Sequence, residues 1–174
     1  TAASLVFPGT RLQLARIGIG LYGLWPSRET MVSLKEQGSE FRLEPVLAWK
    51  TRVAQVKTVA AGEYIGYGCT FRTSRKTRIA VLPVGYYDGY DRKLSNTAYV
   101  LIKGKRAPIR GRVCMNLCMA DITDIQGVKP EDEVVLLGKQ GKEQVSAEQM
   151  AQWIGTINYE VVTRINPQLP RVVG

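Results

Sequence analysis

The sequence predicts a mainly β protein, with antiparallel strands in a barrel- or sandwich-like domain and a short helix near the C-terminal end. Three observations carry this prediction. From Glu44 onward the 174-residue chain is a succession of short apolar or alternating runs, which is the pattern of β-strands. Turn-forming Gly, Pro and Asp residues separate these runs at the spacing typical of antiparallel domains. Apolar residues make up 45% of the chain, enough to bury a core.

The first forty residues have a different composition. Residues 12–24, LQLARIGIGLYGL, mix β-branched side chains with glycines and end at Trp25-Pro26. We therefore expect a buried strand here that leads into a glycine-rich turn. Residues 28–42 are polar, with apolar side chains at helical spacing, which predicts a short helix followed by a linker.

Strand-like runs then follow one another through the second part of the chain. They cover residues 46–59, 78–84, 98–102, 112–122 and 133–137. Lys103-Gly104-Lys105 comes directly after the third run and predicts a hairpin tip, because glycine readily adopts the positive φ that such turns require.

One helix is signalled near the end of the chain. Ser146 and Gln149 have the spacing of a capping box, and Gly155 can terminate the helix that they begin. A second helical turn is expected to start near Thr156 or Asn158.

The sequence contains no histidine. This excludes Ser-His-Asp and Cys-His nucleophile systems, a histidine general base and every histidine-containing metal site. Chemistry must come from Tyr, Lys, Arg, Asp, Glu or Cys side chains, or from a cofactor. Cys69, Cys114 and Cys118 form no C-x-x-C pair, which disfavours a disulfide framework or a zinc site and indicates a reducing compartment. We expect no bound metal.

The net charge of +9, from 24 Lys and Arg against 15 Asp and Glu, favours anionic partners such as phosphate or carboxylate. The positive charges are spread along the chain, which argues against a nucleic-acid or membrane partner. No apolar run approaches the roughly 18 residues that span a bilayer. Together with the cysteine pattern, this predicts a cytoplasmic protein.

Two segments place tyrosines beside glycines. In residues 62–71, GEYIGYGCTF, Tyr67 has glycine on both sides, so it is either an accessible phenol or a turn aromatic that covers the edge of the core. Residues 84–92, VGYYDGYDR, contain three tyrosines and an arginine. They fit either a functional strand exit or a hairpin with surface aromatics, since Asp-Gly is a common turn pair.

Three further segments remain open between a structural and a functional role. Residues 15–23, ARIGIGLYG, formally match a dinucleotide fingerprint, but no βαβ pattern surrounds them. They could expose backbone amides to a phosphate or simply form a tight turn. Residues 111–119, GRVCMNLCM, alternate like a strand whose Cys and Met fill the core. Residues 156–160, TINYE, resemble an ordinary helix start.

Taken in order, these segments resemble the C-terminal portion of bacterial alanine racemases. The matching motifs are R-x-G-x-x-x-Y-G-x-x-P-S, Y-G-x-T-[FY], P-V-G-Y-x-D-G-x-x-R, G-R-V-C-M and T-I-N-Y-E, from Arg16 to the end of the chain. In that family a (β/α)₈ barrel of the TIM type precedes a mostly β domain, and two subunits pair so that each active site uses residues of both. The resemblance implies that residues 1–40 are the end of the last β/α unit of that barrel and residues 41–174 the C-terminal β-domain.

The family uses pyridoxal 5'-phosphate, and the resemblance assigns cofactor contacts to five positions. Arg16 matches the arginine that faces the pyridine nitrogen, and because a guanidinium does not give up its proton, that nitrogen stays unprotonated. The ring is then a weaker electron sink, which favours return of the proton to Cα over transamination. The phosphate contacts match a hydroxyl, two backbone amides and a phenol, which belong to Thr1, Gly18, Ile19 and Tyr159.

Substrate contacts are implied in the same way. Tyr67 resembles the catalytic tyrosine, which removes the α-proton of the L-enantiomer or returns it, at the cofactor of the opposite subunit. The backbone N–H of Met115 matches the contact to the substrate carboxylate. Tyr86, Arg92 and Arg112 match residues of the substrate entryway.

The chain also departs from the family pattern. It lacks the stretch with the lysine that forms the Schiff base and acts as the second base, and Lys50, Lys57 and Lys103 occur in unrelated β contexts. The arginine of the barrel that grips the substrate carboxylate is absent too. Asn116 stands where many members carry Asp. We therefore expect a C-terminal fragment that is inactive alone and binds no cofactor covalently.

The predicted parent activity is the interconversion of L- and D-alanine by a two-base mechanism that uses a tyrosine and a lysine, supplying D-alanine for peptidoglycan. Its expected partners are alanine, the barrel portion of the same protein and a second subunit. A serine or broad-specificity racemase is an alternative. A non-catalytic β-domain for dimerisation or nucleic-acid binding is an alternative of another class.

Overall fold

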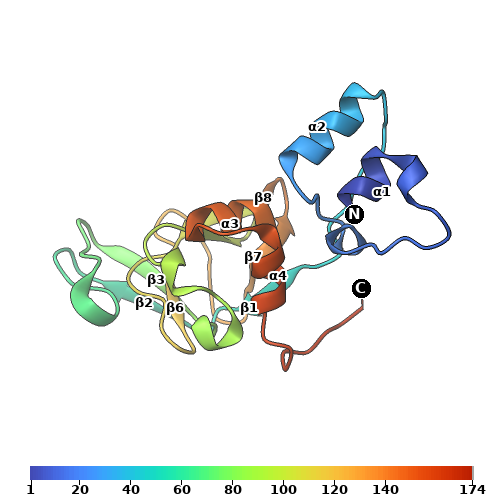
Figure 1. Cartoon of the computed structure of the whole chain (residues 1–174). Helices are drawn as coiled ribbons and strands as arrows, with labels where there is room; N and C mark the ends of the chain where they lie inside the picture. The colour runs from blue at the N-terminus through green and yellow to red at the C-terminus, as the bar shows by residue number, and fades with distance from the viewer. Residues whose placement is uncertain (174) are drawn as a thin grey trace. The chain divides into compact units, whose positions relative to one another are not determined.

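The computed structural model describes residues 1–173, and the chain divides into two compact units, the first of which is Thr1–Leu47 (Figure 1). The first unit holds the helices α1 (Ala2–Val6) and α2 (Arg28–Glu36). Short 3₁₀ turns lie between them at Pro8–Thr10 and Ile19–Tyr22.

The buried strand predicted for residues 12–24 is wrong. Residues 14–18 have no regular structure, and Leu12 and Leu14 are 82% and 81% exposed. The physical reason is the lack of a pairing partner: residues 1–47, which the structure describes throughout, contain no strand whose backbone could pair with this one. Within residues 12–24, the buried residues are Ile19, Gly23 and Leu24, in the turn that follows and directly after it.

The helix predicted after Pro26 is confirmed. Ser27 begins α2 as its N-cap, because its Oγ accepts a hydrogen bond of 3.2 Å from the Thr30 backbone N–H. Past the helix, the Phe41 ring packs edge to face on Trp25, with ring centroids 6.2 Å apart. The first unit has a small interior of its own, which includes Ile19, Leu24 and Leu34.

The second unit begins at Ala48 and is built on two antiparallel sheets, which confirms the mainly β prediction (Figure 1). One sheet has the strand order β1-β7-β4-β5, with β8 paired to β7, and the other has the order β2-β3-β6. The strands are β1 (Trp49–Arg52), β2 (Gln55–Val59), β3 (Thr77–Leu82), β4 (Tyr99–Ile102), β5 (Lys105–Pro108), β6 (Cys118–Asp121), β7 (Glu133–Gln140) and β8 (Glu143–Val145).

Two of the predicted runs differ from the strands observed. Residues 46–59 form two strands, because the backbone at Val53 and Ala54 passes from one sheet to the other. Val53 N–H donates to Asp132 O at 3.0 Å, and Ala54 N–H donates to Val81 O at 2.9 Å. In 112–122 only β6 is a strand. The short strands β5 and β8 lie outside all of the predicted runs.

The predicted turn and helices of this unit are confirmed. Lys103 and Gly104 have φ of 51° and 70° and form the two-residue tip between β4 and β5. Two helices follow the strands, α3 (Ala147–Ile154) and α4 (Asn158–Arg164). Ser146 Oγ accepts from Gln149 N–H at 3.1 Å, although the Gln149 side chain accepts a hydrogen bond from Tyr99 instead of closing a capping box.

The core of the second unit lies between these elements. β4 and β7 contribute its most buried side chains, including Leu101 and Leu136, both with no exposed surface. Tyr90 is also fully buried and packs edge to face on Trp49, at 5.9 Å between ring centroids. No helix within residues 1–173 is long and apolar enough to cross a membrane.

Candidate functional site

Tyr67 stands out in the β-domain because it is a large aromatic side chain that is 77% exposed. It begins a 3₁₀ turn between Gly66 and Gly68, whose φ values are 75° and 71°. A Cβ on Gly66 would lie 2.8 Å from Met119 Cε, and one on Gly68 would lie 3.0 Å from Arg112 Nε. Only glycine fits both positions, since each has a left-handed backbone and a close neighbour. The phenol is therefore presented outward.

The segment that carries this turn, residues 60–73, is tied at its base. Thr73 is buried, and its hydroxyl donates to Ala60 O at 2.6 Å and accepts from Glu63 N–H at 3.0 Å. Further up, Ile65 N–H donates to Phe71 O at 3.0 Å. The segment is thus a closed loop with Tyr67 in its distal half.

A hollow of about 600 Å³ opens beside Tyr67. The residues that line it include five of the site residues predicted from the sequence, Tyr67, Tyr86, Arg92, Arg112 and Met115, together with Asn116. These residues come from three separate segments, so the fold brings together positions that are up to 49 residues apart in the sequence.

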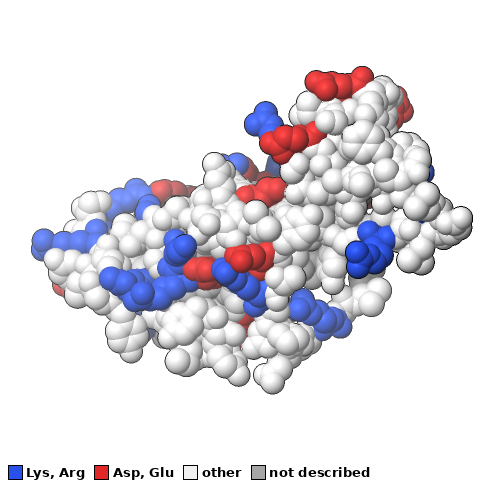
Figure 2. Space-filling view, viewed as in Figure 1, with Lys and Arg blue, Asp and Glu red and all other residues white. Residues whose placement is uncertain are grey.

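The hollow is electropositive. The guanidinium groups of Arg92 and Arg112 have no hydrogen-bond or ion-pair partner in the part of the chain that the structure describes, and none of the lining residues is acidic. Two unpaired guanidinium groups beside two phenols favour a small anionic ligand such as a carboxylate. On the face shown in Figure 2, by contrast, Lys and Arg lie in separate patches interrupted by Asp and Glu, without the continuous basic stripe of a nucleic-acid surface.

At Met115 the backbone carbonyl is hydrogen-bonded and, among the described residues, the backbone N–H is not. Tyr86 and Tyr87 N–H groups donate to the carbonyls of Cys114 and Met115, each at 3.0 Å. The N–H of Met115 donates to no acceptor within residues 1–173. It is therefore available to a ligand in the hollow.

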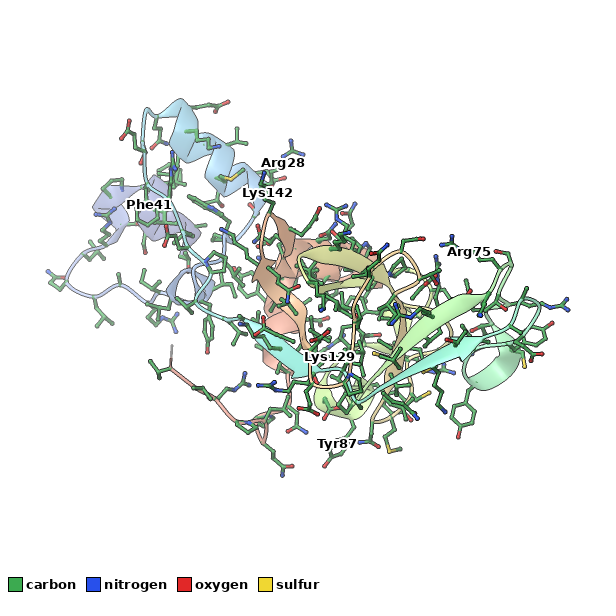
Figure 3. The ribbon with its side chains drawn as sticks, turned by 180° about the vertical axis from the view of Figure 1, so that it is seen from behind. Arg28, Phe41, Arg75, Tyr87, Lys129 and Lys142 are labelled. Atoms are coloured by element: carbon green, nitrogen blue, oxygen red, sulfur yellow. The ribbon has the colours of Figure 1, made fainter. Side chains whose placement is uncertain are left out.

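Gly85 and Asp88 allow the Tyr86–Tyr87 backbone to approach the carbonyls of Cys114 and Met115, and the sequence analysis did not predict either as a site residue. A Cβ on Gly85 would lie 2.1 Å from the Cys114 oxygen and 2.3 Å from the Met115 oxygen. Asp88 Oδ2 accepts from Gly85 N–H at 2.9 Å. The spacing of a turn-starting residue and an acceptor three positions later was the signal that could have identified the pair. Tyr87, between them, points away from the domain (Figure 3).

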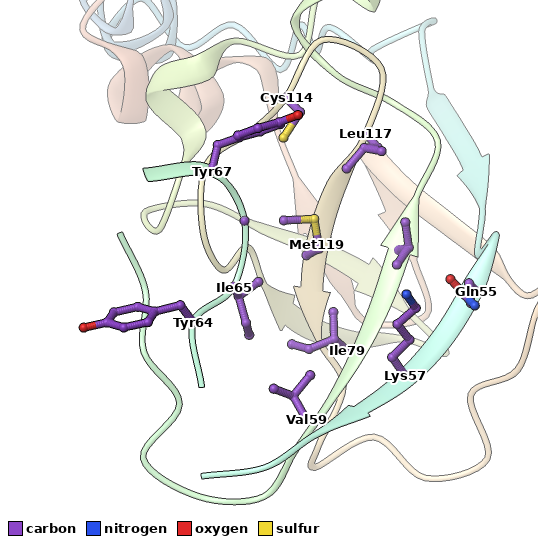
Figure 4. A pocket seen from close by; sticks show the side chains of 12 residues that line it. Gln55, Lys57, Val59, Tyr64, Ile65, Tyr67, Ile79, Cys114, Leu117 and Met119 are labelled. Carbon is purple, nitrogen blue, oxygen red and sulfur yellow. The ribbon is translucent and has the colours of Figure 1, made fainter. Parts of the chain in front are cut away.

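A second hollow, of about 640 Å³, adjoins Tyr67 on the β2-β3-β6 sheet. Figure 4 shows Tyr67 and Cys114 at one end and Lys57 at the other, with Ile79 and Met119 along the floor. Its lining is mostly apolar. The hollow is thus suited to contact with another apolar surface.

The cysteines are not equivalent. Cys118 is buried, and burial raises the pKa of its thiol far above the usual range. The prediction that cysteine and methionine fill the core holds for Cys118 and Met119, which are buried, although Met119 also reaches the floor of the second hollow. Cys114 is half-buried and Met115 is exposed, so the prediction does not hold for them. Among the described residues, no cluster of three or more Cys, Asp or Glu side chains could hold a metal ion.

The first unit brings together a second group of predicted residues. Thr1 Oγ1 accepts from the Gly18 N–H at 3.0 Å and from the Gly20 N–H at 3.4 Å. The N–H of Ile19 donates to no acceptor in residues 1–173. Arg16 is exposed and unpaired there as well. The Ile19 amide is thus unused between two amides that share the Thr1 hydroxyl, and successive backbone N–H groups are a common arrangement for binding a phosphate.

Tyr159, the remaining predicted residue, belongs to the β-domain. It lies half-buried in the first turn of α4. Next to it, Glu160 forms an ion pair with Arg164 at 2.9 Å across one helical turn.

The chain is similar to known proteins along nearly all of its length. Residues 46–173 match the family model described as alanine racemase, C-terminal domain. The chain is 47% identical over 174 residues to the alanine racemase of Leptospira interrogans, covering 99% of this chain and 45% of that protein. It thus spans about half the length of the curated relatives that it matches.

Solved structures show the same likeness. The alanine racemase of Bacillus anthracis with bound L-Ala-P has a TM-score of 0.86 and 42% identity, covering 95% of this chain and 41% of the other. That of Bartonella henselae with covalently bound pyridoxal phosphate has a TM-score of 0.78 and 30% identity, covering 91% and 41%. The chain described above therefore belongs to the alanine racemase family, with the family's C-terminal domain at residues 46–173.

Proposed function

We propose that this chain is the C-terminal part of an enzyme that interconverts L- and D-alanine with pyridoxal 5'-phosphate, and that the enzyme supplies D-alanine for peptidoglycan. The observation that carries the proposal is Tyr67, an exposed phenol held beside two unpaired arginines and a free backbone N–H in one hollow. Residues 1–40 are, in this proposal, the end of the cofactor-binding barrel and residues 41–174 the β-domain.

The first unit fits the phosphate of the cofactor. The Ile19 N–H, which donates to no acceptor within residues 1–173, would hold that phosphate together with the Thr1 hydroxyl. The Gly18 N–H donates to Thr1 Oγ1 and would contact the phosphate by exchanging that acceptor. The resemblance to the family gives Tyr159 a phosphate contact as well. Arg16 would donate a hydrogen bond to the pyridine nitrogen and keep its own proton. The bound cofactor supplies an electron sink for the negative charge that develops at the substrate Cα.

In the β-domain, Tyr67 Oη would take the α-proton from L-alanine or return it. Arg112, whose Nε lies against Gly68, lines the same hollow as Tyr67 and is a hydrogen-bond donor there. The Met115 N–H would bind the substrate carboxylate, and Tyr86 and Arg92 would line its path.

We propose that the second base comes from outside this chain. Lys50 and Lys103 form ion pairs with Glu133 at 3.0 Å and with Asp132 at 3.3 Å. Lys57 lies on β2, at the far end of the apolar hollow from Tyr67 (Figure 4). We propose that a subunit containing the cofactor lysine completes the site, in a homodimer whose active sites are shared. The isolated chain should then show no racemase activity.

The test uses the whole protein that contains this chain. Tyr67→Phe removes only the phenolic oxygen, and we expect racemisation of L-alanine, followed by circular dichroism, to fall by about 10²- to 10⁴-fold, as for the loss of a general acid–base group. Tyr64→Phe is the matched control, because Tyr64 is an exposed tyrosine of the same loop that contacts Arg72. Near-normal activity of folded Tyr67→Phe protein would refute the catalytic proposal.

The second candidate function is a β-domain that only supports dimerisation, and the apolar hollow beside Tyr67 favours it. In that case Tyr67→Phe leaves the rate unchanged while the association of subunits depends on the apolar lining. A panel of L-amino acids separates the remaining possibility, a serine or broad-specificity racemase, since such an enzyme would turn over serine or larger substrates as fast as alanine.

A further inference from the structure

We propose that Asn96 is a positioning residue that holds the Tyr67 turn against the segment carrying Arg112. The proposal rests on the proposed function for its kinetic consequences, but its geometry stands alone. Asn96 follows a 3₁₀ turn that begins at Arg92, and it contacts two segments, one 26 residues before it and one 15 residues after it.

Both the oxygen and the nitrogen of the Asn96 side-chain amide form hydrogen bonds. Its Oδ1 accepts from the Gly111 N–H at 2.6 Å, and its Nδ2 donates to the Thr70 carbonyl at 3.4 Å and to the Thr70 hydroxyl at 3.3 Å. An amide is suited to this task because it donates and accepts at once. The backbone also favours asparagine, since φ at Asn96 is 59° and asparagine tolerates the left-handed region.

These bonds close a ring around the Tyr67 turn. Thr70 ends the turn, and Ile65 precedes its first glycine. Gly111 packs directly on Ile65, since a Cβ on Gly111 would lie 2.4 Å from the Ile65 carbonyl oxygen. Asn96 therefore joins the end of the turn to the glycine that supports its beginning.

The Tyr67 turn, residues 66–70, has few polar contacts with other segments. Apart from hydrogen bonds inside the turn, residues 66–70 make no polar contact with the rest of residues 1–173 except through Asn96. The other contacts are van der Waals contacts of Gly66 and Gly68 with their neighbours. Loss of the Asn96 amide thus removes the polar contacts that residues 66–70 make outside the turn, while the Ile65–Phe71 hydrogen bond at its base remains.

Residues 95–96 also fix the backbone position of Arg112. Ser95 Oγ accepts from Val113 N–H at 2.9 Å, so Ser95 and Asn96 bind the amides on either side of Arg112. Arg112 Nε in turn lies against Gly68. One short segment, 95–96, therefore sets the relative position of the phenol and its cationic neighbour, although neither residue touches the reacting atoms in the proposed mechanism.

The decisive variant is Asn96→Gly in the whole cofactor-containing enzyme. Glycine removes the amide and keeps the left-handed backbone without strain, which alanine would not. Because a misplacement of 1 Å can cost about 100-fold in rate, we expect kcat to fall by about 10- to 100-fold with KM changed less than about threefold. Exchange of the Gly111 amide hydrogen should accelerate at least about tenfold, since it loses its acceptor.

Two further variants sharpen the test. Glu131→Gly is the control, because Glu131 also has a positive φ, of 70°, and its exposed side chain has no partner among the described residues. It should leave both kcat and Gly111 exchange unchanged. Asn96→Asp keeps the acceptor for Gly111 and loses the donor to Thr70, so it should preserve Gly111 protection and still lower kcat.

An isotope effect separates positioning from general destabilisation. If the phenol is misplaced, the primary deuterium effect on kcat should rise with L-alanine deuterated at Cα, where Tyr67 is the base, and change less with deuterated D-alanine. Unchanged kcat in Asn96→Gly, or an equal loss in Glu131→Gly, would overturn the proposal. A wild-type enzyme without racemase activity would refute the proposed function instead, and unaltered Gly111 exchange in Asn96→Gly would then overturn the positioning role.

Discussion

Gly85→Ala tests the close packing of residues 85–87 on the backbone carbonyls of Cys114 and Met115, in the turn at these two residues, the Met115 turn. Gly85 has an extended backbone, with φ of −153° and ψ of −161°, which alanine also adopts. Any effect must therefore come from contact. The new methyl carbon would lie 2.1 Å from the Cys114 oxygen and 2.3 Å from the Met115 oxygen. Since carbon and oxygen normally approach no closer than about 3.2 Å, the turn must move by about 1 Å.

That movement has two energetic consequences. It breaks or weakens the hydrogen bonds from the Tyr86 and Tyr87 amides to those two oxygens, each worth about 1 kcal/mol. It also adds overpacking of about 1–3 kcal/mol. We expect the free energy of unfolding to fall by about 3–5 kcal/mol, which lowers the melting temperature by roughly 10 °C in a chain of this size.

Urea unfolding and calorimetry of the purified protein measure this loss. Gly9→Ala is the control, because a Cβ on Gly9 would meet no atom within 4 Å and its φ is not positive. The racemase rate of the whole enzyme should fall as well, since the Met115 N–H moves with the turn. A Gly85→Ala protein that unfolds within about 0.5 kcal/mol of the wild type would refute the contact argument.

Three other predictions follow from the same contacts. Asp88→Ala removes the carboxylate that accepts from the Gly85 N–H at the start of the 3₁₀ turn Tyr86–Asp88, and should lower the free energy of unfolding in urea by about 0.5–2 kcal/mol. A loss of stability no larger than that of a surface substitution would contradict this capping role. The pKa of Glu133 is lowered mainly by its hydrogen bond from Lys50, so the pair stabilises the fold above the unfolded-state pKa of about 4.3 and loses this effect as pH falls through the folded-state value. Lys50→Met should therefore cost less than about 1 kcal/mol at pH 7 and almost nothing near pH 2, and a constant difference across that range would exclude the ion pair as its cause. Iodoacetamide should label the exposed Cys69 in the native protein and the buried Cys118 only after unfolding, as read by peptide mass spectrometry; equal native labelling would place Cys118 at the surface.

Local patterns in the sequence predicted much of the β-domain. The Lys103-Gly104 hairpin tip and the Ser146 cap were predictable because each depends on residues adjacent in sequence. The strand expected at residues 12–24 was wrong because a strand also needs a partner, which local pattern cannot supply. The division of residues 46–59 into two strands depends on Asp132 and Val81, far along the chain.

The residues of the candidate site also fall into two groups, those that local sequence patterns identified and those that depend on distant contacts. Tyr67 was identified because flanking glycines are a local signal of an exposed turn, and the structure places it at the hollow. Asn96 was not identified, since its two contacts are 26 and 15 residues away and no motif marks them. Residue types show which groups can react, while long-range hydrogen bonds decide how they are aimed.

The passage of the backbone from one sheet to the other at Val53 and Ala54 has a consequence for denaturation. Val53 donates to Asp132 and accepts from Glu131 beside the first sheet, while its neighbour Ala54 donates to Val81 in the second. Neither sheet can come apart without pulling on the other through a single peptide unit. The β-domain should consequently melt as one cooperative unit, with native-state hydrogen exchange reporting the same opening energy for both layers.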